Sequence, residues 1–152
     1  MPGLLEDRPS DLRRLPVLLH RAREAFSVRF RDVFQEHDLT DQQWRILLLI
    51  RSDPSSDISD LGRRSFLLGP SLTRILRSLA ERGLILRRPD PEDARRAFHE
   101  LTPKGAALID EVAPNFDPIY TDLATRLDAE NLARLTHELE VLLRTLNPGA
   151  LD

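Results

Sequence analysis

The feature that most constrains the fold is an amphipathic helix that leads directly into a hairpin pattern. Pro70 suits the first turn of this helix, which is predicted to end near Arg82, and Gly83 suits the left-handed position that follows. Two short strands are predicted next, from Leu84 to Arg88 and from Ala97 to Leu101, around a long polar tip. The apolar side chains that recur at helical spacing are Leu72, Ile75, Leu76 and Leu79.

Further helices are predicted before this unit. The first runs to His37 with Ser10 as its N-cap, and at about 1.5 Å per residue it would be roughly 40 Å long. Thr40 and Gln43 form a capping-box pattern for a second helix that ends near Ser52. Asp57 caps a third, which ends near Phe66. A helix as long as the first exceeds what a small core needs, and this suggests that a second chain packs against it.

Helical patterns also follow the hairpin. Thr102 caps a helix whose path Pro114 and Pro118 should bend or break between Val112 and Asp117. The last helix begins near Asp128 and carries a stripe of leucines, which are Leu132, Leu135, Leu139, Leu142, Leu143 and Leu146. The predicted fold class is therefore mainly α, a winged helix-turn-helix with a short β-hairpin wing and flanking dimerisation helices. We expect one domain over residues 1–152, with a DNA-binding lobe at 39–101 and dimerisation helices at 10–37 and 103–147.

Composition excludes several kinds of site. The chain has no cysteine, and its four histidines are too scattered to give ligand spacing within one helix turn, so we expect neither a metal nor a cofactor. A Gly-rich phosphate loop, a nucleophile elbow and an H-E-x-x-H motif are all missing, so we do not expect an enzyme. No apolar run approaches the roughly 18 residues that span a membrane, and the first residues lack a signal-peptide pattern. We therefore expect a cytoplasmic location.

The distribution of charge favours nucleic acid as a partner. The net charge is −3, but residues 59–101 contain nine arginines and six acids. The face of the predicted helix opposite its apolar stripe presents Ser71, Thr73, Arg74, Arg77 and Ser78, which suit base edges and phosphates in a major groove. The alternative for these five is an ordinary solvated face. At the tip of the hairpin, Asp93 could orient Arg95 toward a minor groove beside Arg96, and the alternative there is a salt-bridged surface loop.

Five segments carry a family pattern: LTDQQWRI at 39–46, GPSLTRIL at 69–76, ERGLI at 81–85, DARR at 93–96 and LTPKG at 101–105. With them, the chain resembles the MarR family of bacterial regulators, and within it the branch that regulates homoprotocatechuate operons. This resemblance implies a homodimer that binds a pseudo-palindromic operator in double-stranded DNA. It also implies that the protein represses an aromatic catabolic operon, and that a small aromatic acid, or its coenzyme A thioester, releases the repressor from the DNA.

The resemblance assigns roles to individual residues. It places Ser71, Thr73 and Arg74 near bases, Arg77 on phosphate, and Arg95 in the minor groove with Asp93 orienting it; Arg96 adds a second charge at the wing. It also puts an effector pocket between the dimer helices and the DNA-binding lobe. The candidates for that pocket are His20, Arg23, Ser27, Trp44 and Arg45. Arginine would pair with a carboxylate and Trp would stack on a ring, whereas the alternatives are plain core packing and ordinary ion pairs.

Three features depart from the family pattern. Gly62 lies in a helix where alanine is usual, and Pro114 and Pro118 leave the dimer geometry open. His99 replaces an apolar strand residue and is expected to be hydrogen-bonded and partly buried, and the alternative for it is a role in pH or ligand response. The alternative functions are a winged-helix regulator that responds to drugs or other phenolics, and a protein-binding winged-helix module without DNA binding.

Overall fold

The structure is a computed structural model that describes residues 8–93 and 96–147. It is mainly helical, with one two-stranded antiparallel sheet among the described residues. The elements in chain order are α1 (Arg8–Val28), α2 (Arg31–Glu36), α3 (Asp41–Ser52), α4 (Ile58–Ser65), α5 (Gly69–Glu81), β1 (Ile85–Pro89), β2 (Ala97–Leu101), α6 (Pro103–Val112), η1 (Ala113–Phe116, a 3₁₀ helix), α7 (Asp117–Leu127) and α8 (Ala129–Leu146). This order confirms the predicted winged helix-turn-helix fold class.

Local capping signals set the starts of several helices. Thr40 and Gln43 form both halves of the capping box that opens α3. The Asp57 carboxylate accepts the Asp60 N–H at the start of α4, and the Thr102 hydroxyl oxygen accepts the Gly105 N–H at the start of α6. These starts confirm the predicted caps.

Gly83 ends α5 in the left-handed region, with a φ of 69°. Its N–H donates to the Ala80 carbonyl, and the Leu84 N–H donates back to the Leu79 carbonyl. This pair of hydrogen bonds is the Schellman arrangement, which turns the chain out of the helix. The turn carries the chain directly into β1, as the sequence predicted.

The prediction of one continuous helix from Ser10 to His37 is wrong. The helix α1 already begins at Arg8 and ends at Val28, and α2 follows after a turn at residues 29–30. Within this turn the Arg29 N–H donates to the Phe26 carbonyl, three residues earlier, whereas an α-helical N–H donates to the carbonyl four residues earlier. The break directs Phe30 inward, where only 7% of its surface stays exposed. Burial of this ring is the physical reason that the helix does not continue.

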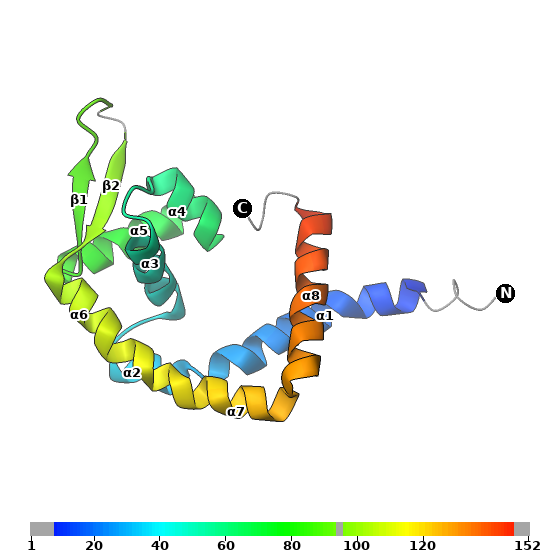
Figure 1. Cartoon of the computed structure of the whole chain (residues 1–152). Helices are drawn as coiled ribbons and strands as arrows, with labels where there is room; N and C mark the ends of the chain where they lie inside the picture. Colours follow the sequence, from blue (N-terminus) through cyan, green and yellow to red (C-terminus); the bar gives the residue numbers. More distant parts are fainter. Residues whose placement is uncertain (1–7, 94–95, 148–152) are drawn as a thin grey trace.

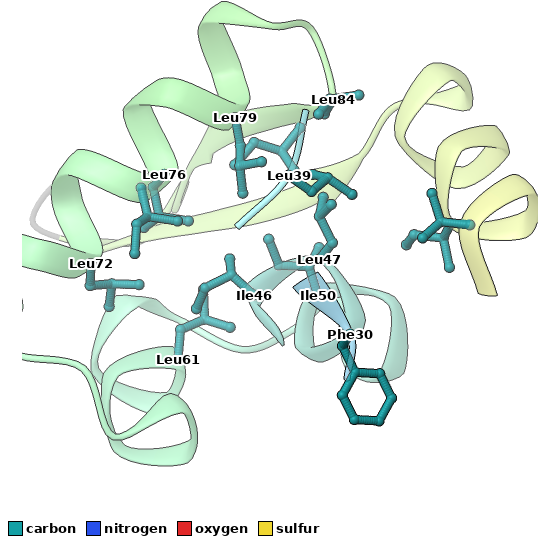
Figure 2. Packing of buried hydrophobic residues seen from close by; sticks show 14 of the residues in the cluster. Phe30, Leu39, Ile46, Leu47, Ile50, Leu61, Leu72, Leu76, Leu79 and Leu84 are labelled. Atoms are coloured by element: carbon teal, nitrogen blue, oxygen red, sulfur yellow. The ribbon is translucent and has the colours of Figure 1, made fainter. Parts of the chain in front are cut away.

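The core lies between α3, α5 and the base of the hairpin. Ile46, Leu47 and Ile50 of α3 are almost fully buried, and the apolar stripe of α5 points toward them (Figure 2). Ile85 at the start of β1 pairs with Leu101 at the end of β2, so that the sheet closes this core on one side. The buried stripe of α5 leaves its other face free for contacts outside the chain.

The two prolines break the helix after the hairpin where the sequence predicted. The helix α6 ends at Val112, a short 3₁₀ helix follows, and α7 starts at Asp117 with Pro118 in its first turn. Figure 1 shows the hairpin, α4 and α5 at one end of the molecule, α6 and α7 along its base, and α1 and α8 extending at the other end. The lobe predicted at residues 39–101 and the terminal helices α1 and α8 are thus separated along the chain and in space.

The terminal helices leave much apolar surface uncovered. No residue of α8 is buried, and α1 exposes several large apolar side chains. The exposed apolar residues on the two helices are Leu12, Val17, Leu18, Leu19, Phe26, Val28, Leu132, Leu135, Leu139, Val141, Leu143 and Leu146. None of the helices within residues 8–93 and 96–147 is long and apolar enough to cross a membrane.

Candidate functional site

The outer face of α5 carries the arginines predicted to contact DNA. Thr73, Arg74 and Arg77 are exposed and Ser71 is half-buried. Neither Arg74 nor Arg77 forms an ion pair with any residue that the structure describes. Seven other arginines of the lobe do contact an acid or a carbonyl, and they are Arg45, Arg51, Arg63, Arg64, Arg82, Arg88 and Arg96. The two charges on α5 are therefore available to phosphates without the loss of an existing pair.

The Thr73 hydroxyl is already used inside the helix. It donates to the Gly69 carbonyl at 3.0 Å, which leaves its methyl group and an oxygen lone pair facing outward. Thr73 can accept a hydrogen bond or touch an apolar base group, but it would donate only by giving up this internal bond. Ser78, one turn further on, accepts a hydrogen bond from Gln43 of α3 at 3.3 Å. This contact fixes the outer part of α5 against α3.

The hairpin is tied to α4 through Arg96. Its guanidinium donates to the Asp57 carboxylate at 3.0 Å and lies 5.6 Å from the centre of the Phe98 ring. The Asp60 N–H at the start of α4 lowers the pKa of Asp57, and Arg96 lowers it further. Arg96 thus contacts its own protein, although the sequence placed it among the DNA ligands. Arg95 lies outside the described residues, and the Asp93 carbonyl accepts the Arg96 N–H at 2.9 Å.

A pocket lies where α1, α2, α3, η1 and α7 meet, between the terminal helices and the reading lobe. Its volume is about 110 Å³. We call it the aromatic pocket, and its lining residues are Phe26, Ser27, Phe30, Phe34, Asp41, Trp44, Phe116 and Tyr120. The chain has six Phe, one Trp and one Tyr, and all of them except Phe66 and Phe98 line this pocket. Such a concentration of rings suits a flat, apolar ligand.

Phe116 is the centre of this cluster. Its ring centroid lies 5.2 Å from that of Trp44, 5.4 Å from that of Phe34 and 5.6 Å from that of Phe30. These separations and the tilted ring planes are those of favourable aromatic pairs. Because Phe116 is the last residue of η1, the proline-induced break is what places this ring in the pocket.

A second hollow adjoins the aromatic pocket. It has a volume of about 310 Å³ and shares Ser27, Phe34 and Asp41 with the first. Arg31 of α2 lines it and brings a positive charge to this end. The first hollow is thus lined by rings, Asp41 lines both hollows, and the second hollow carries the Arg31 guanidinium.

Two of the five residues predicted to bind an effector line this cavity. Ser27 and Trp44 are lining residues. His20 and Arg23 are exposed on α1, where Arg23 lies 3.5 Å from Glu24, and neither lines the cavity. Arg45 points instead to Asp41 and to the Ser65 carbonyl. The prediction missed five of the six rings together with Asp41 and Arg31, for which the clustering of aromatic residues at 26–34 and 116–120 was the available signal.

His99 is more deeply buried than predicted, with 4% of its surface exposed. The expected hydrogen bond is missing at Nδ1, which has no partner among the described residues. Burial lowers the pKa of His99, and the nearby Arg87, its cross-strand neighbour, lowers it further. The imidazole of this β2 residue is therefore part of the core, and its burial disfavours the charged form. The described residues contain no cluster of three side chains able to hold a metal.

A helix-turn-helix followed by a hairpin, with two exposed arginines on the outer face of α5, defines a winged-helix protein of the DNA-binding class. The family model described as the MarR family matches residues 37–96. The homoprotocatechuate degradative operon repressor of Escherichia coli is 38% identical over 126 residues, which are 83% of this chain and 85% of that protein. The chain belongs to the MarR family, and it is a transcriptional regulator rather than an enzyme.

Two solved structures extend the comparison. NadR in complex with 4-hydroxyphenylacetate superposes on this chain with a TM-score of 0.72 at 35% identity, and the match covers 84% of this chain and 91% of the NadR chain. A mutant of E. coli MarR complexed with operator DNA gives a TM-score of 0.80 at 25% identity, and the match covers 91% of this chain and 98% of the MarR chain. Both share the winged-helix fold described above.

Proposed function

We propose that this regulator is a homodimeric repressor that binds a pseudo-palindromic operator and releases it when a small aromatic acid, or its thioester, fills the aromatic pocket. The observation that carries the DNA-binding part is the pair of exposed guanidinium groups on α5, Arg74 and Arg77, which form no ion pair within residues 8–93 and 96–147. The E. coli MarR complex, which holds operator DNA on the same fold, supports it. In this proposal the lobe at 39–101 reads DNA and the helices at 10–37 and 103–147 form the dimer.

On the DNA, we assign Ser71, Thr73 and Arg74 to base edges and nearby phosphates, and Arg77 to a phosphate. The side chains of Leu72 and Ile75 are buried, so only the opposite face of α5 is free to enter a major groove. At the wing, Arg95 with Asp93 and Arg96 stays assigned to the minor groove from the sequence pattern. Arg96 joins this group with its guanidinium held by Asp57.

The dimer is supported by the uncovered apolar faces of α1 and α8. Side chains such as Leu135 and Leu139 are between a third and a half exposed within the single chain. A helix whose apolar stripe faces water gains stability when a second copy covers it. Two reading lobes held in this way would contact successive major grooves of a pseudo-palindromic site.

For the effector, the cavity favours an aromatic ring that carries both a hydrogen-bond donor and an anionic group. The ring would stack among Phe116, Trp44 and Phe34, a phenolic hydroxyl could donate to Asp41 or Ser27, and a carboxylate could pair with Arg31. Relatives support this class, since one represses homoprotocatechuate degradation and another is seen with 4-hydroxyphenylacetate. His20 and Arg23 remain predicted contributors from the exposed face of α1, and Arg45 is treated in the next section.

Operator binding is tested by fluorescence anisotropy with the protein's own upstream region over a range of salt concentrations. Arg74→Ala and Arg77→Ala should each weaken binding and reduce the slope of log affinity against log salt by about 1. Arg126→Ala is the matched control, because this exposed arginine lies on α7 and pairs with Asp122. If the wild type shows no preference over random DNA, the protein-binding alternative replaces this proposal.

Effector binding is tested with a panel of phenolic and aromatic acids and their thioesters. A ligand that prefers the non-binding conformation must both raise the melting temperature and lower operator affinity, because the two effects are linked. Phe116→Leu should weaken both effects together, since it removes the central ring. If only unrelated drug-like phenolics act, the responder to drugs and other phenolics becomes the better description.

A further inference from the structure

We infer that Arg45 is a positioning residue that links the aromatic pocket to the reading helix α5 through Asp41 and the Ser65 carbonyl. This inference rests on the proposed function and concerns how an occupied pocket changes the DNA-binding surface. It assigns Arg45 a role different from direct effector binding. Three features of the structure support it: the place of Asp41 in the cavity, the two contacts of the Arg45 guanidinium, and the backbone that follows Ser65.

Asp41 lies where the two hollows meet and lines both of them. Its carboxylate accepts a hydrogen bond from Arg45 Nη2 at 2.6 Å, one turn along α3. Both side chains keep substantial contact with solvent, so the ion pair alone contributes little to stability. The pair is therefore weak enough for a ligand to rearrange.

The other nitrogen of the same guanidinium reaches out of the pocket. Arg45 Nη1 donates to the Ser65 carbonyl at 2.8 Å. Ser65 is the last residue of α4 and is fully buried, and carbonyls at a helix C-terminus need a partner from outside the helix. Arg45 supplies that partner, so the end of α4 depends on a side chain that Asp41 holds in place.

The chain after Ser65 leads directly to α5. Phe66 adopts a left-handed conformation with a φ of 56°, which is unfavourable for a residue with a side chain, and α5 begins at Gly69. The Phe66 N–H makes only a long hydrogen bond of 3.4 Å to the Arg63 carbonyl. With so weak a bond of its own, this turn relies on the Arg45 contact to hold α4 and α5 in register.

An anionic effector would disturb this arrangement at the Asp41–Arg45 ion pair. A carboxylate that pairs with Arg31 would lie in the hollow that Asp41 also lines, so it would repel the Asp41 carboxylate and attract the Arg45 guanidinium. When Arg45 turns toward the ligand, the Ser65 carbonyl loses its partner and the turn before α5 loosens. The ligand then favours a conformation in which α5 no longer fits the groove, which is the differential affinity that release requires.

The test uses Arg45→Lys, which keeps the charge and the one-turn spacing to Asp41 but replaces two donor nitrogens, each on its own acceptor, with the single nitrogen of a shorter ammonium side chain. Arg51→Lys is the matched control, because Arg51 is on the same helix and pairs with Asp110 of α6 at 2.7 Å. Amide hydrogen exchange over residues 66–72 is measured in the full-length proteins without ligand. Operator affinity is then measured with and without 4-hydroxyphenylacetate as the probe.

We expect exchange at residues 66–69 to rise about tenfold in Arg45→Lys, the effect of losing one charge-assisted hydrogen bond, and to stay unchanged in Arg51→Lys. We also expect the probe to lower the operator affinity of the wild type at least about fivefold and that of Arg45→Lys by less than twofold. Wild-type protection of this turn in Arg45→Lys would overturn the inference. A full response to the probe in that variant would overturn it as well.

Failure of the proposed function has a different signature. It shows as a wild-type protein that binds neither the operator nor the probe. In that case the exchange measurement decides alone, because the link between Arg45 and the turn exists in the free protein.

Discussion

Replacing Gly105 with alanine is expected to force the hairpin and α6 apart. A Cβ atom added at Gly105 would lie 2.0 Å from the Leu84 carbonyl oxygen and 3.0 Å from its carbon. Nonbonded carbon atoms pack at about 3.5 to 4.0 Å, so backbone must move by more than about 1 Å. The same Leu84 oxygen accepts hydrogen bonds from the N–H and the hydroxyl of Thr102, at 3.1 Å and 3.2 Å. Movement of the strand would weaken these bonds as well.

The expected loss for Gly105→Ala is about 3 kcal/mol in the free energy of unfolding, from overpacking and weakened hydrogen bonds. For a chain of this length that corresponds to a fall of roughly 6–12 °C in melting temperature. Gly62→Ala is the matched control with the opposite sign. There the nearest atoms to an added Cβ are the Leu72 Cδ2 at 3.5 Å and the Leu67 oxygen at 3.8 Å, which are ordinary contacts. Removing a helical glycine should then raise the melting temperature by about 2–4 °C.

Both variants are compared with the wild type by thermal and urea denaturation at one protein concentration, because association makes the melting temperature depend on concentration. A melting temperature for Gly105→Ala within about 2 °C of the wild type would refute the reasoning, since about 1 kcal/mol is the smallest cost the contact allows. A melting temperature of Gly62→Ala below that of the wild type would also refute the reasoning, because an added Cβ makes only ordinary contacts there.

Three further predictions concern single side chains. The pKa of His99 is lowered in the folded state, so the unfolded chain takes up this proton first and stability should fall as the pH drops below about 6.5; urea midpoints from pH 8 to pH 5 should show this loss in the wild type and less of it in His99→Leu. Arg96→Gln and Asp57→Ser should each weaken operator binding several-fold, because both break the Arg96–Asp57 contact while serine keeps the cap of α4. The double variant should then bind the operator as tightly as either single variant, and fully additive losses of affinity in anisotropy titrations would contradict this. Phe116→Ala removes a ring that is 5% exposed and should cost about 3–5 kcal/mol in the free energy of unfolding, measured by urea denaturation.

The sequence predicted those parts of the fold that depend on neighbouring residues. The capping box at Thr40, the left-handed Gly83 and the break after Val112 all follow from short-range chemistry, and the structure confirms each. The end of α1 at Val28 could not be predicted in this way. It depends on Phe30 meeting Phe116 and Tyr120, which are distant in the sequence.

The same distinction explains the effector site. The family resemblance places the pocket between the dimer helices and the DNA-binding lobe, and the chemistry of single side chains makes arginines such as Arg23 and Arg45 natural partners of a carboxylate. In the folded chain Arg23 faces solvent beside Glu24, and the guanidinium of Arg45 is occupied by Asp41 and Ser65. The position of a pocket depends on which distant segments meet, and no single residue type reveals it.

The prolines that depart from the family pattern give the pocket its position in the molecule. Pro114 lies in η1, whose last residue, Phe116, fills the centre of the pocket, and Pro118 starts the helix α7 that carries Tyr120. On the other side of the same cavity, Asp41 begins α3 and leads into the reading lobe. A ligand in this cavity therefore contacts both the segment that orients the terminal helices and the segment that supports α5. Because both meet at one ring cluster, a change there can alter the spacing of two lobes and the setting of each reading helix together.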